Sequence, residues 1–166
     1  MWRCLATALS VLTLAACATP ERRELPVPVR LSIAASELLN PTEQGRASPV
    51  VVRVYEMVAS SYFQGADFFT LLGDLDKAKN EEVKDVQEYV LMPGEVRVVR
   101  RKADLNTRYL GVVAGYRDLQ GSAWRSLVAV SPPHRAGRLW SSDTSPEQKY
   151  RIAVGEKAIA IEEVAE

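Results

Sequence analysis

The sequence predicts a mainly β protein, a two-layer β-sandwich of about eight strands with a short helical insertion between the second and third strands. Three observations lead to this fold class. Apolar and polar residues alternate along most of the chain, which is the period of a half-buried strand. Turn residues separate the alternating segments at the short spacing that is typical of sandwiches. A helical spacing of apolar residues interrupts the alternation between the second and third strands.

The amino-terminal segment is expected to be an export signal rather than part of the sandwich. Arg3 precedes an apolar run over residues 5–16, which is shorter than the roughly 20 residues of a membrane-spanning helix. The run ends in Leu-Ala-Ala-Cys at residues 14–17, the lipobox pattern at which bacterial lipoproteins are cleaved and lipidated. The alternative is an ordinary signal peptide that happens to precede a cysteine.

We therefore expect a lipoprotein signal peptide over residues 1–16, a lipidated tether over residues 17–26 and a β-sandwich domain over residues 27–166. Cys17 would carry the covalent lipid. The residue after it is Ala18, whereas an aspartate there is the usual signal for retention in the inner membrane. We therefore expect a protein that is anchored in the outer membrane and faces the periplasm.

Eight segments show the strand period, and turn or loop residues bound each of them. In chain order they are residues 27–33, 50–55, 85–91, 95–101, 109–116, 124–130, 150–154 and 158–161. Three pairs of these segments are expected to form hairpins. Pro93-Gly94 joins the third and fourth, residues 117–122 join the fifth and sixth, and Gly155-Glu156 joins the last two in an expected type II′ turn.

One insertion, over about residues 60–83, interrupts the strands. Its apolar residues recur at the spacing of a helix face, with Ser60 or Ser61 as an N-cap, and the charged residues 76–83 allow a second short helix. The residues of the helix face are Phe68, Leu71, Leu72 and Leu75. The insertion either covers an open edge or end of a sheet or binds a partner.

The residue types that enzymes need are scattered. His134 is the single histidine and follows Pro132-Pro133, a loop context without a second histidine or cysteine for a metal site. Asp74-Leu75-Asp76 lacks the glycine and the distal glutamate of an EF-hand. The sequence contains no P-loop, no G-x-G-x-x-G fingerprint and no G-x-S-x-G elbow. We therefore expect no enzymatic activity, no metal and no cofactor besides the covalent lipid.

The charge composition argues against a nucleic-acid partner. The 21 basic and 21 acidic residues balance to a formal net charge of zero, and both signs are mixed along the chain. A nucleic-acid-binding domain concentrates positive charge on one face instead. No pattern in the sequence indicates a small-molecule substrate either.

The long connection between the first two strands, residues 36–47, is the candidate interaction site. It exceeds the two to five residues of a hairpin loop, and Asn40-Pro41 and Gly45 prevent a continuous helix or strand. Long loops on a rigid sandwich are common binding elements. Leu38 and Leu39 either pack on the sheet ends or join the contact surface. The candidate partner-binding residues are Leu38, Leu39, Asn40, Pro41, Thr42, Glu43, Gln44, Gly45 and Arg46.

In their order and spacing, several segments resemble the TssJ (SciN/VasD-like) family of outer-membrane lipoproteins of type VI secretion systems. The resemblance extends over nearly the whole mature chain behind Cys17. Its segments are Leu39-Asn40-Pro41, residues 45–55, Phe63, residues 66–69, Leu71-Leu72, residues 91–95, residues 109–118 and Trp124-Arg125.

The resemblance implies a transthyretin-like sandwich with added helices, in agreement with the strand pattern. It also implies a protein–protein interaction within a membrane complex: binding to the periplasmic C-terminal domain of TssM, with TssL as a further subunit and outer-membrane lipid holding the acyl anchor. In the family, the loop between the first two strands makes much of the TssM contact, and by position this loop is residues 36–47. A periplasmic carrier lipoprotein that binds a small apolar or peptide ligand between its sheets is the alternative function.

Overall fold

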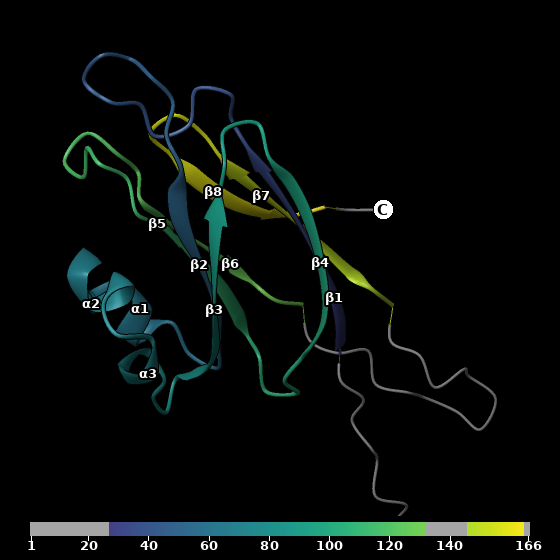
Figure 1. Cartoon of the computed structure of the whole chain (residues 1–166). Coiled ribbons are helices and arrows are strands. Elements are labelled where there is room, and N and C mark those ends of the chain that lie inside the picture. Colours follow the sequence, from purple (N-terminus) through teal and green to yellow (C-terminus); the bar gives the residue numbers. More distant parts are fainter. Residues whose placement is uncertain (1–26, 132–145, 165–166) are drawn as a thin grey trace, which may run out of the picture.

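The structure, a computed structural model, describes residues 27–131 and 146–164 (Figure 1). The expected signal peptide and tether, with Cys17, lie outside the described residues, and so does His134. Within the described part of the chain, no helix has both the length and the apolar character needed to cross a membrane.

The described residues form eight strands in two four-stranded sheets (Figure 1). The strands are β1 (Val27–Ala35), β2 (Val50–Met57), β3 (Val83–Leu91), β4 (Val96–Ala103), β5 (Tyr109–Ala114), β6 (Arg125–Ala129), β7 (Gln148–Val154) and β8 (Ile159–Glu163). Sheet A has the order β4-β1-β7-β8, and sheet B has the order β3-β2-β5-β6. Neighbouring strands are antiparallel, except that β1 and β7 run parallel. The prediction of a mainly β, two-layer sandwich of about eight strands is confirmed.

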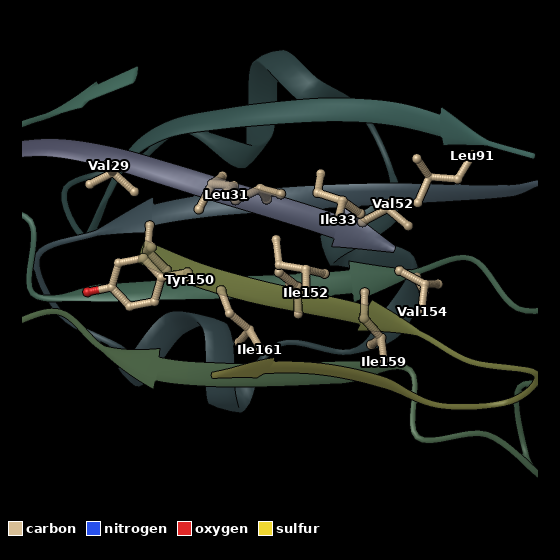
Figure 2. Packing of buried hydrophobic residues seen from close by; sticks show 14 of the residues in the cluster. Val29, Leu31, Ile33, Val52, Leu91, Tyr150, Ile152, Val154, Ile159 and Ile161 are labelled. Carbon is tan, nitrogen blue, oxygen red and sulfur yellow. The ribbon is translucent and has the colours of Figure 1, made fainter. Parts of the chain in front are cut away.

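The main core lies between the two sheets, where the inward side chains of both layers meet. Val29, Leu31 and Ile33 of β1 are at most 1% exposed, while the residues between them are half-buried on the outer face. In Figure 2 they gather with Val52 of β2 and Ile152 of β7. Burying one such aliphatic side chain contributes about 1.5–3 kcal/mol, so the period-two pattern of the sequence holds the two sheets face to face.

The predicted hairpin around Pro93-Gly94 is wrong. β3 pairs with β2 in sheet B, whereas β4 pairs with β1 in sheet A, so this turn crosses from one sheet to the other. The turn bonds to the end of β1: Gly94 N–H donates to Ser36 O at 3.1 Å, and Ala35 N–H donates to Glu95 O at 2.8 Å. Proline and glycine specify that the chain reverses. The bonds to β1 decide which strand the returning segment joins.

The other two hairpins are confirmed, because β5 pairs with β6 and β7 pairs with β8. The predicted type II′ turn at Gly155-Glu156 is wrong. Such a turn needs a positive φ at its first central residue, and among the described glycines φ is positive at Gly45 and Gly94 only. Gly155 N–H instead donates to Ala158 O at 2.7 Å, which closes a wider connection over residues 155–158.

The insertion between β2 and β3 contains three short helices, α1 (Ser61–Gly65), α2 (Phe68–Leu72) and α3 (Leu75–Ala78) (Figure 1). They cover the outer face of sheet B, and not an edge or an end of it, which was the first of the two alternatives. Their buried side chains pack on outward side chains of β2 and β5. The predicted helix face is divided between two helices: α2 ends at Leu72, and Gly73 follows it as C-cap. The predicted second helix is α3, which is shorter than residues 76–83: it ends at Ala78, and Val83 already begins β3.

The predicted serine cap does not form. Ser60 precedes α1, but its side chain makes no capping bond, and its Oγ accepts from Gln64 Nε2 at 2.8 Å. Asp67 caps α2 instead, accepting from Thr70 N–H at 2.8 Å. This bond to Thr70 holds the pKa of the Asp67 carboxyl below its ordinary value.

Arg53 of β2 fixes α2 to sheet B. Its Nη1 donates to Leu71 O at 2.9 Å and its Nη2 donates to Gly73 O at 2.7 Å, while its Nε donates to Glu88 Oε2 at 2.8 Å. The carbonyls at the end of a helix have no partner within the helix. The buried guanidinium therefore satisfies the end of α2 and joins the insertion to β2 and β3.

Candidate functional site

Three connections gather at one end of the sandwich, opposite to the end at which β1 begins (Figure 1). They follow β1, β5 and β7 and comprise residues 36–49, 115–124 and 155–158. Between them lies an open hollow of about 860 Å³. It is lined by Leu38, Pro41, Thr42, Glu43, Gln44, Gly45, Arg117, Asp118, Glu156 and Lys157. We call this end the loop end and the opposite end, where Val27 begins β1, the tether end.

Asn40 fixes the base of the β1–β2 connection. Its Nδ2 donates to Pro49 O at 2.9 Å, and its Oδ1 accepts from Arg117 N–H at 2.9 Å. Its backbone N–H donates to Glu156 O at 3.2 Å, so one residue joins all three connections. Its φ of 45° lies in the left-handed region, which asparagine adopts more readily than most residues. Asn40 is therefore a buried structural residue and not part of an exposed tip.

The two predicted leucines differ in their surroundings. Leu39 is fully buried in the core between the sheets, whereas Leu38 is 59% exposed at the rim of the hollow. The backbone of Leu39 is also fixed: its N–H donates to Ser36 O at 3.1 Å, and its carbonyl accepts from Ser48 N–H at 2.9 Å. Of this pair, Leu39 packs on the sheet ends, and Leu38 is open to a partner.

The tip of the connection is a tight turn that its own backbone holds. Thr42 N–H donates to Arg46 O at 2.8 Å, and Gly45 N–H donates to Thr42 O at 2.9 Å. The φ of Gly45 is 75°, a conformation that glycine adopts without strain. Glu43, Gln44, Gly45 and Arg46 are exposed on this turn. Because the turn is preformed, little free energy is lost in ordering this loop when a partner binds it.

The wall across from the tip contains an ion pair. Lys157 Nζ lies 2.9 Å from Asp118 Oδ2, and both side chains are about half exposed. Asp118 Oδ1 also accepts from Gly121 N–H at 3.0 Å. The bond from Lys157 is the main reason why the pKa of the Asp118 carboxyl is lowered, and Asp118 in turn raises the pKa of the Lys157 amine. Both groups are charged at neutral pH, so the rim presents charges of both signs.

Sequence reasoning missed the contribution of Arg117, Asp118, Glu156 and Lys157 to this surface. A signal for it exists in the order of the strands. Successive strands of the sandwich run in opposite directions, in agreement with the parallel pairing of β1 with β7 and the antiparallel pairing of the other neighbours. Every connection that follows an odd-numbered strand therefore lies at the loop end, and counting the predicted strands would have brought these residues together.

The hollow presents groups that can contact a partner. Among the residues that the structure describes, no group of three or more His, Cys, Asp or Glu side chains could hold a metal ion. An exposed leucine beside mixed charges and a rigid polar turn is the composition of a protein docking surface.

Comparisons with known proteins agree with this architecture. A family model described as type VI secretion lipoprotein, VasD, EvfM, TssJ, matches residues 27–157. The crystal structure of the type VI lipoprotein TssJ1 from Pseudomonas aeruginosa is similar with a TM-score of 0.72 and 31% identity, over 86% of this chain and 99% of that chain. Lip of Serratia marcescens, a membrane-bound component of the type VI secretion system, is similar with a TM-score of 0.70 and 25% identity, over 85% and 99% of the two chains.

A third similar structure is described as a type VI membrane complex. The matching chain has a TM-score of 0.59 and 25% identity, over 81% of this chain and 97% of that chain. No curated protein matches the sequence.

Proposed function

Because the chain belongs to the type VI secretion lipoprotein family, we propose that it anchors the trans-envelope secretion complex by binding the periplasmic C-terminal domain of TssM. In this role it is a structural lipoprotein and not an enzyme. TssL belongs to the same complex. The anchor is covalent lipid on Cys17, behind a signal peptide over residues 1–16 and before a tether over residues 17–26, and it holds the domain to the periplasmic side of the outer membrane. No further cofactor takes part.

The observation that supports this proposal most is the construction of the β1–β2 connection. It projects at the loop end, and the tether enters at the opposite end, at Val27. A domain that joins a membrane to a partner needs its two attachment points apart. The nine residues of β1 separate them, which corresponds to about 30 Å.

The TssM contact is proposed to use the part of the connection that a partner can reach. Leu38 and the turn over residues 42–46 present side chains at the rim, whereas buried Leu39 and Asn40 hold the turn in place. Arg117 and Lys157, on the neighbouring connections, extend the same surface.

The central test removes the side chains of the turn without removing the turn itself. The variant Glu43→Ala, Gln44→Ala, Arg46→Ala keeps the backbone bonds of the turn and keeps Asn40 intact. We expect it to weaken binding of the TssM C-terminal domain at least about tenfold, because interface side chains that matter each cost more than about 1 kcal/mol on truncation. Isothermal titration calorimetry with the purified domain of TssM measures this affinity.

The matched control places three alanines on the exposed side of the insertion, at Gln64, Thr70 and Glu81. It should bind like the unaltered chain, and both variants should unfold at the same temperature as that chain. If the turn variant bound TssM as tightly as the unaltered chain, the side chains of the β1–β2 turn would not be part of the interface.

The interior favours this role over that of a carrier. Side chains of both sheets fill the space in which a carrier would hold its ligand (Figure 2). The hollow of about 860 Å³ lies outside this core, among the loops. A layer about 10 Å thick between two sheets is normally filled by the protein's own side chains.

A further inference from the structure

Three aromatic rings lie in a row on the surface beside the loop end. The ring centroids of Phe69 and Phe68 are 5.4 Å apart, edge to face, and the ring of Phe68 lies 5.4 Å from that of Trp124 in the same geometry. The guanidinium of Arg125 covers the far ring, with its Cζ 4.9 Å from the centroid of the Trp124 ring. We call Phe68, Phe69 and Trp124 the aromatic cluster.

The two phenylalanines of the cluster do not belong to the cores of the fold. Phe69 is 76% exposed, the largest value among the large apolar side chains that the structure describes. Phe68 is half-buried and packs on neither of the two buried cores, whereas Trp124 packs on both. Apolar side chains stabilise a fold by leaving water. The exposed phenylalanine rings therefore contribute little to the stability of this one.

The helix that carries both phenylalanines, α2, is held rigidly. It has five residues, too few to be stable by itself. Before its first turn, Arg125 Nη1 donates to Ala66 O at 3.1 Å. At its end, Arg53 Nη1 and Tyr55 Oη both donate to Leu71 O. Side chains of sheet B thus hold the helix at both ends, and a partner that binds the rings loses little free energy in ordering them.

The aromatic cluster borders the hollow along the β5–β6 connection. Trp124 is the last residue of this connection, and Arg117 and Asp118 of the same connection line the hollow. The N–H of Ala123 donates to Lys157 O at 2.9 Å, which joins the connection to the opposite wall. In Figure 1, α2 lies next to this connection. A partner seated in the hollow can therefore reach the cluster.

The hollow by itself lacks the apolar centre of a stable interface. Among its ten lining residues, Leu38 and Pro41 are the two with apolar side chains, and none of the ten is aromatic. A stable interface takes about 20–30 residues from each partner, and its centre is enriched in aromatic residues and arginine. A single phenylalanine can bury about 150–250 Å². The aromatic cluster supplies this missing part.

We propose that the aromatic cluster is the apolar centre of the TssM contact, with Phe69 seated in an apolar pocket of the periplasmic C-terminal domain of TssM. This inference rests on the proposed function, because it adds a second part to the same contact. The β1–β2 turn and the hollow then form the polar side of the interface, and Arg125 lies at the rim of the cluster. The bilayer does not cover the rings, because the proposed anchor lies at the tether end and the cluster borders the loop end.

Phe69→Ala tests the cluster without disturbing either core, since this side chain lies outside both. We expect the affinity for the TssM domain to fall at least about 30-fold, the effect of truncating an aromatic side chain at the centre of an interface. The temperature of unfolding should equal that of the unaltered chain. Isothermal titration calorimetry measures the affinity, as for the turn variant.

Two controls are matched to this variant. Val96→Ala truncates another exposed apolar side chain, 68% exposed, on the outer face of sheet A. The alanine variant of Gln64, Thr70 and Glu81 changes the insertion but keeps all three rings. Both should bind TssM like the unaltered chain, because contacts around a hot spot contribute little singly. Unchanged affinity in Phe69→Ala, or an equal loss in Val96→Ala, would overturn the proposal.

The same measurements keep the inference distinct from the function on which it rests. A loss in the turn variant, with Phe69→Ala binding normally, removes the cluster from the contact and leaves the proposed function standing. An unaltered chain that does not bind the TssM domain removes the proposed function itself. Analytical ultracentrifugation of the chain alone tests a second copy as the occupant. A dimer that Phe69→Ala converts to a monomer, with the TssM affinity kept, would overturn the assignment of the cluster to TssM.

Discussion

Two polar side chains, Asn40 and Glu56, are buried, and each of them has hydrogen-bond or ionic partners. Asn40 joins three connections at the loop end. Glu56, at the tether end of β2, is 3% exposed, accepts from Thr107 Oγ1 and pairs with Arg101 of β4 in the other sheet. A buried polar group without a partner costs free energy, so each of these residues makes its neighbours depend on it.

Asn40→Ala should lower the free energy of unfolding by about 2–4 kcal/mol. The substitution leaves Pro49 O and Arg117 N–H without their partner and places alanine at a φ of 45°. Urea denaturation followed by circular dichroism measures the loss. Asn40→Gly removes the same bonds but tolerates the backbone, so it should lose less; an alanine variant as stable as the unaltered protein would contradict the structural role of Asn40.

Glu56→Leu should destabilise the protein by about 3 kcal/mol, because it leaves the Arg101 guanidinium buried without its main partner. Burial lowers the pKa of Arg101, but the pKa of a guanidinium lies so far above neutral that the side chain keeps its charge at neutral pH. The double variant Glu56→Leu, Arg101→Met should recover most of the loss, since an apolar pair replaces the ionic one. Denaturation of the two singles and the double gives the coupling energy; additive effects would mean that the two residues act independently.

At the scale of the elements, the helical insertion covers one sheet and forms a second core with it. Tyr55 and Met57 of β2 and Val113 of β5 form a second core with Phe63 and Leu71 on the outer face of sheet B. This explains why β2 and β5 are buried on both faces, whereas β1 alternates. Phe69 is 76% exposed and lies outside this core, with its ring against Phe68.

The close approach of α1 to sheet B depends on Gly111 of β5. A Cβ atom at this position would lie 2.7 Å from Phe63 Cζ and 2.9 Å from Met57 Cε, and both of those side chains are buried. Gly111→Ala should therefore cost about 1–3 kcal/mol by overpacking. Phe63→Leu in the same chain should relieve part of the cost, as a double-mutant cycle in urea measures. If alanine at this position left the stability unchanged, α1 would not be held against the sheet as described.

At the scale of the whole molecule, the two ends of the sandwich differ. Val27, which follows the proposed tether, lies at one end, the three connections of the hollow lie at the other, and the alternating strand directions enforce this separation. The insertion occupies the outer face of sheet B, so the outer face of sheet A is the broad surface of the described domain that no helix covers (Figure 1). The proposed anchor and the proposed docking loops therefore lie at opposite ends of the domain.

The packed interior as a whole should make the protein sensitive to alkaline pH. Burial raises the pKa of Tyr116, and it raises the pKa of Tyr150 to about 12. An unfolded tyrosine ionises near pH 10, so these phenols stabilise the fold fully below about pH 10, and their contribution is lost as pH rises toward 12. Urea denaturation at pH 8 and at about pH 11 should show this decline, and Tyr150→Phe should make it shallower.

Absorbance of tyrosinate provides an independent measurement. The folded protein should ionise fewer of its six tyrosines at about pH 11 than the protein in denaturant. A folded protein in which all tyrosines ionise together near pH 10 would contradict the burial of Tyr116 and Tyr150.

Much of the fold was predictable because strand formation is a local property. Alternation places Val29, Leu31 and Ile33 on one face regardless of the partner strand, and a helical spacing marks the insertion. The partner of each strand is not local. The turn at Pro93-Gly94 had the residues of a hairpin, yet bonds from the end of β1 direct β4 into the other sheet.

The candidate site divides in the same way. The length of the β1–β2 connection and the residues of its tip were visible in the sequence, since proline, asparagine and glycine interrupt regular structure there. That Leu39 and Asn40 are buried, and that Asp118 and Lys157 complete the rim, depends on contacts between segments 39 to 116 residues apart in the chain.

By itself, the sequence determined where strands and breaks occur and which face of each strand is apolar, because these follow from the spacing of side chains along one stretch of backbone. It also determined the lipobox and hence the expectation of an anchored protein. Only the tertiary structure decided which strands pair, that the insertion covers sheet B, and that Phe68 lies against Trp124. The physical reason is that these outcomes depend on burial and hydrogen bonding between residues that are distant in the chain. The spacing of residues within one segment does not indicate such contacts.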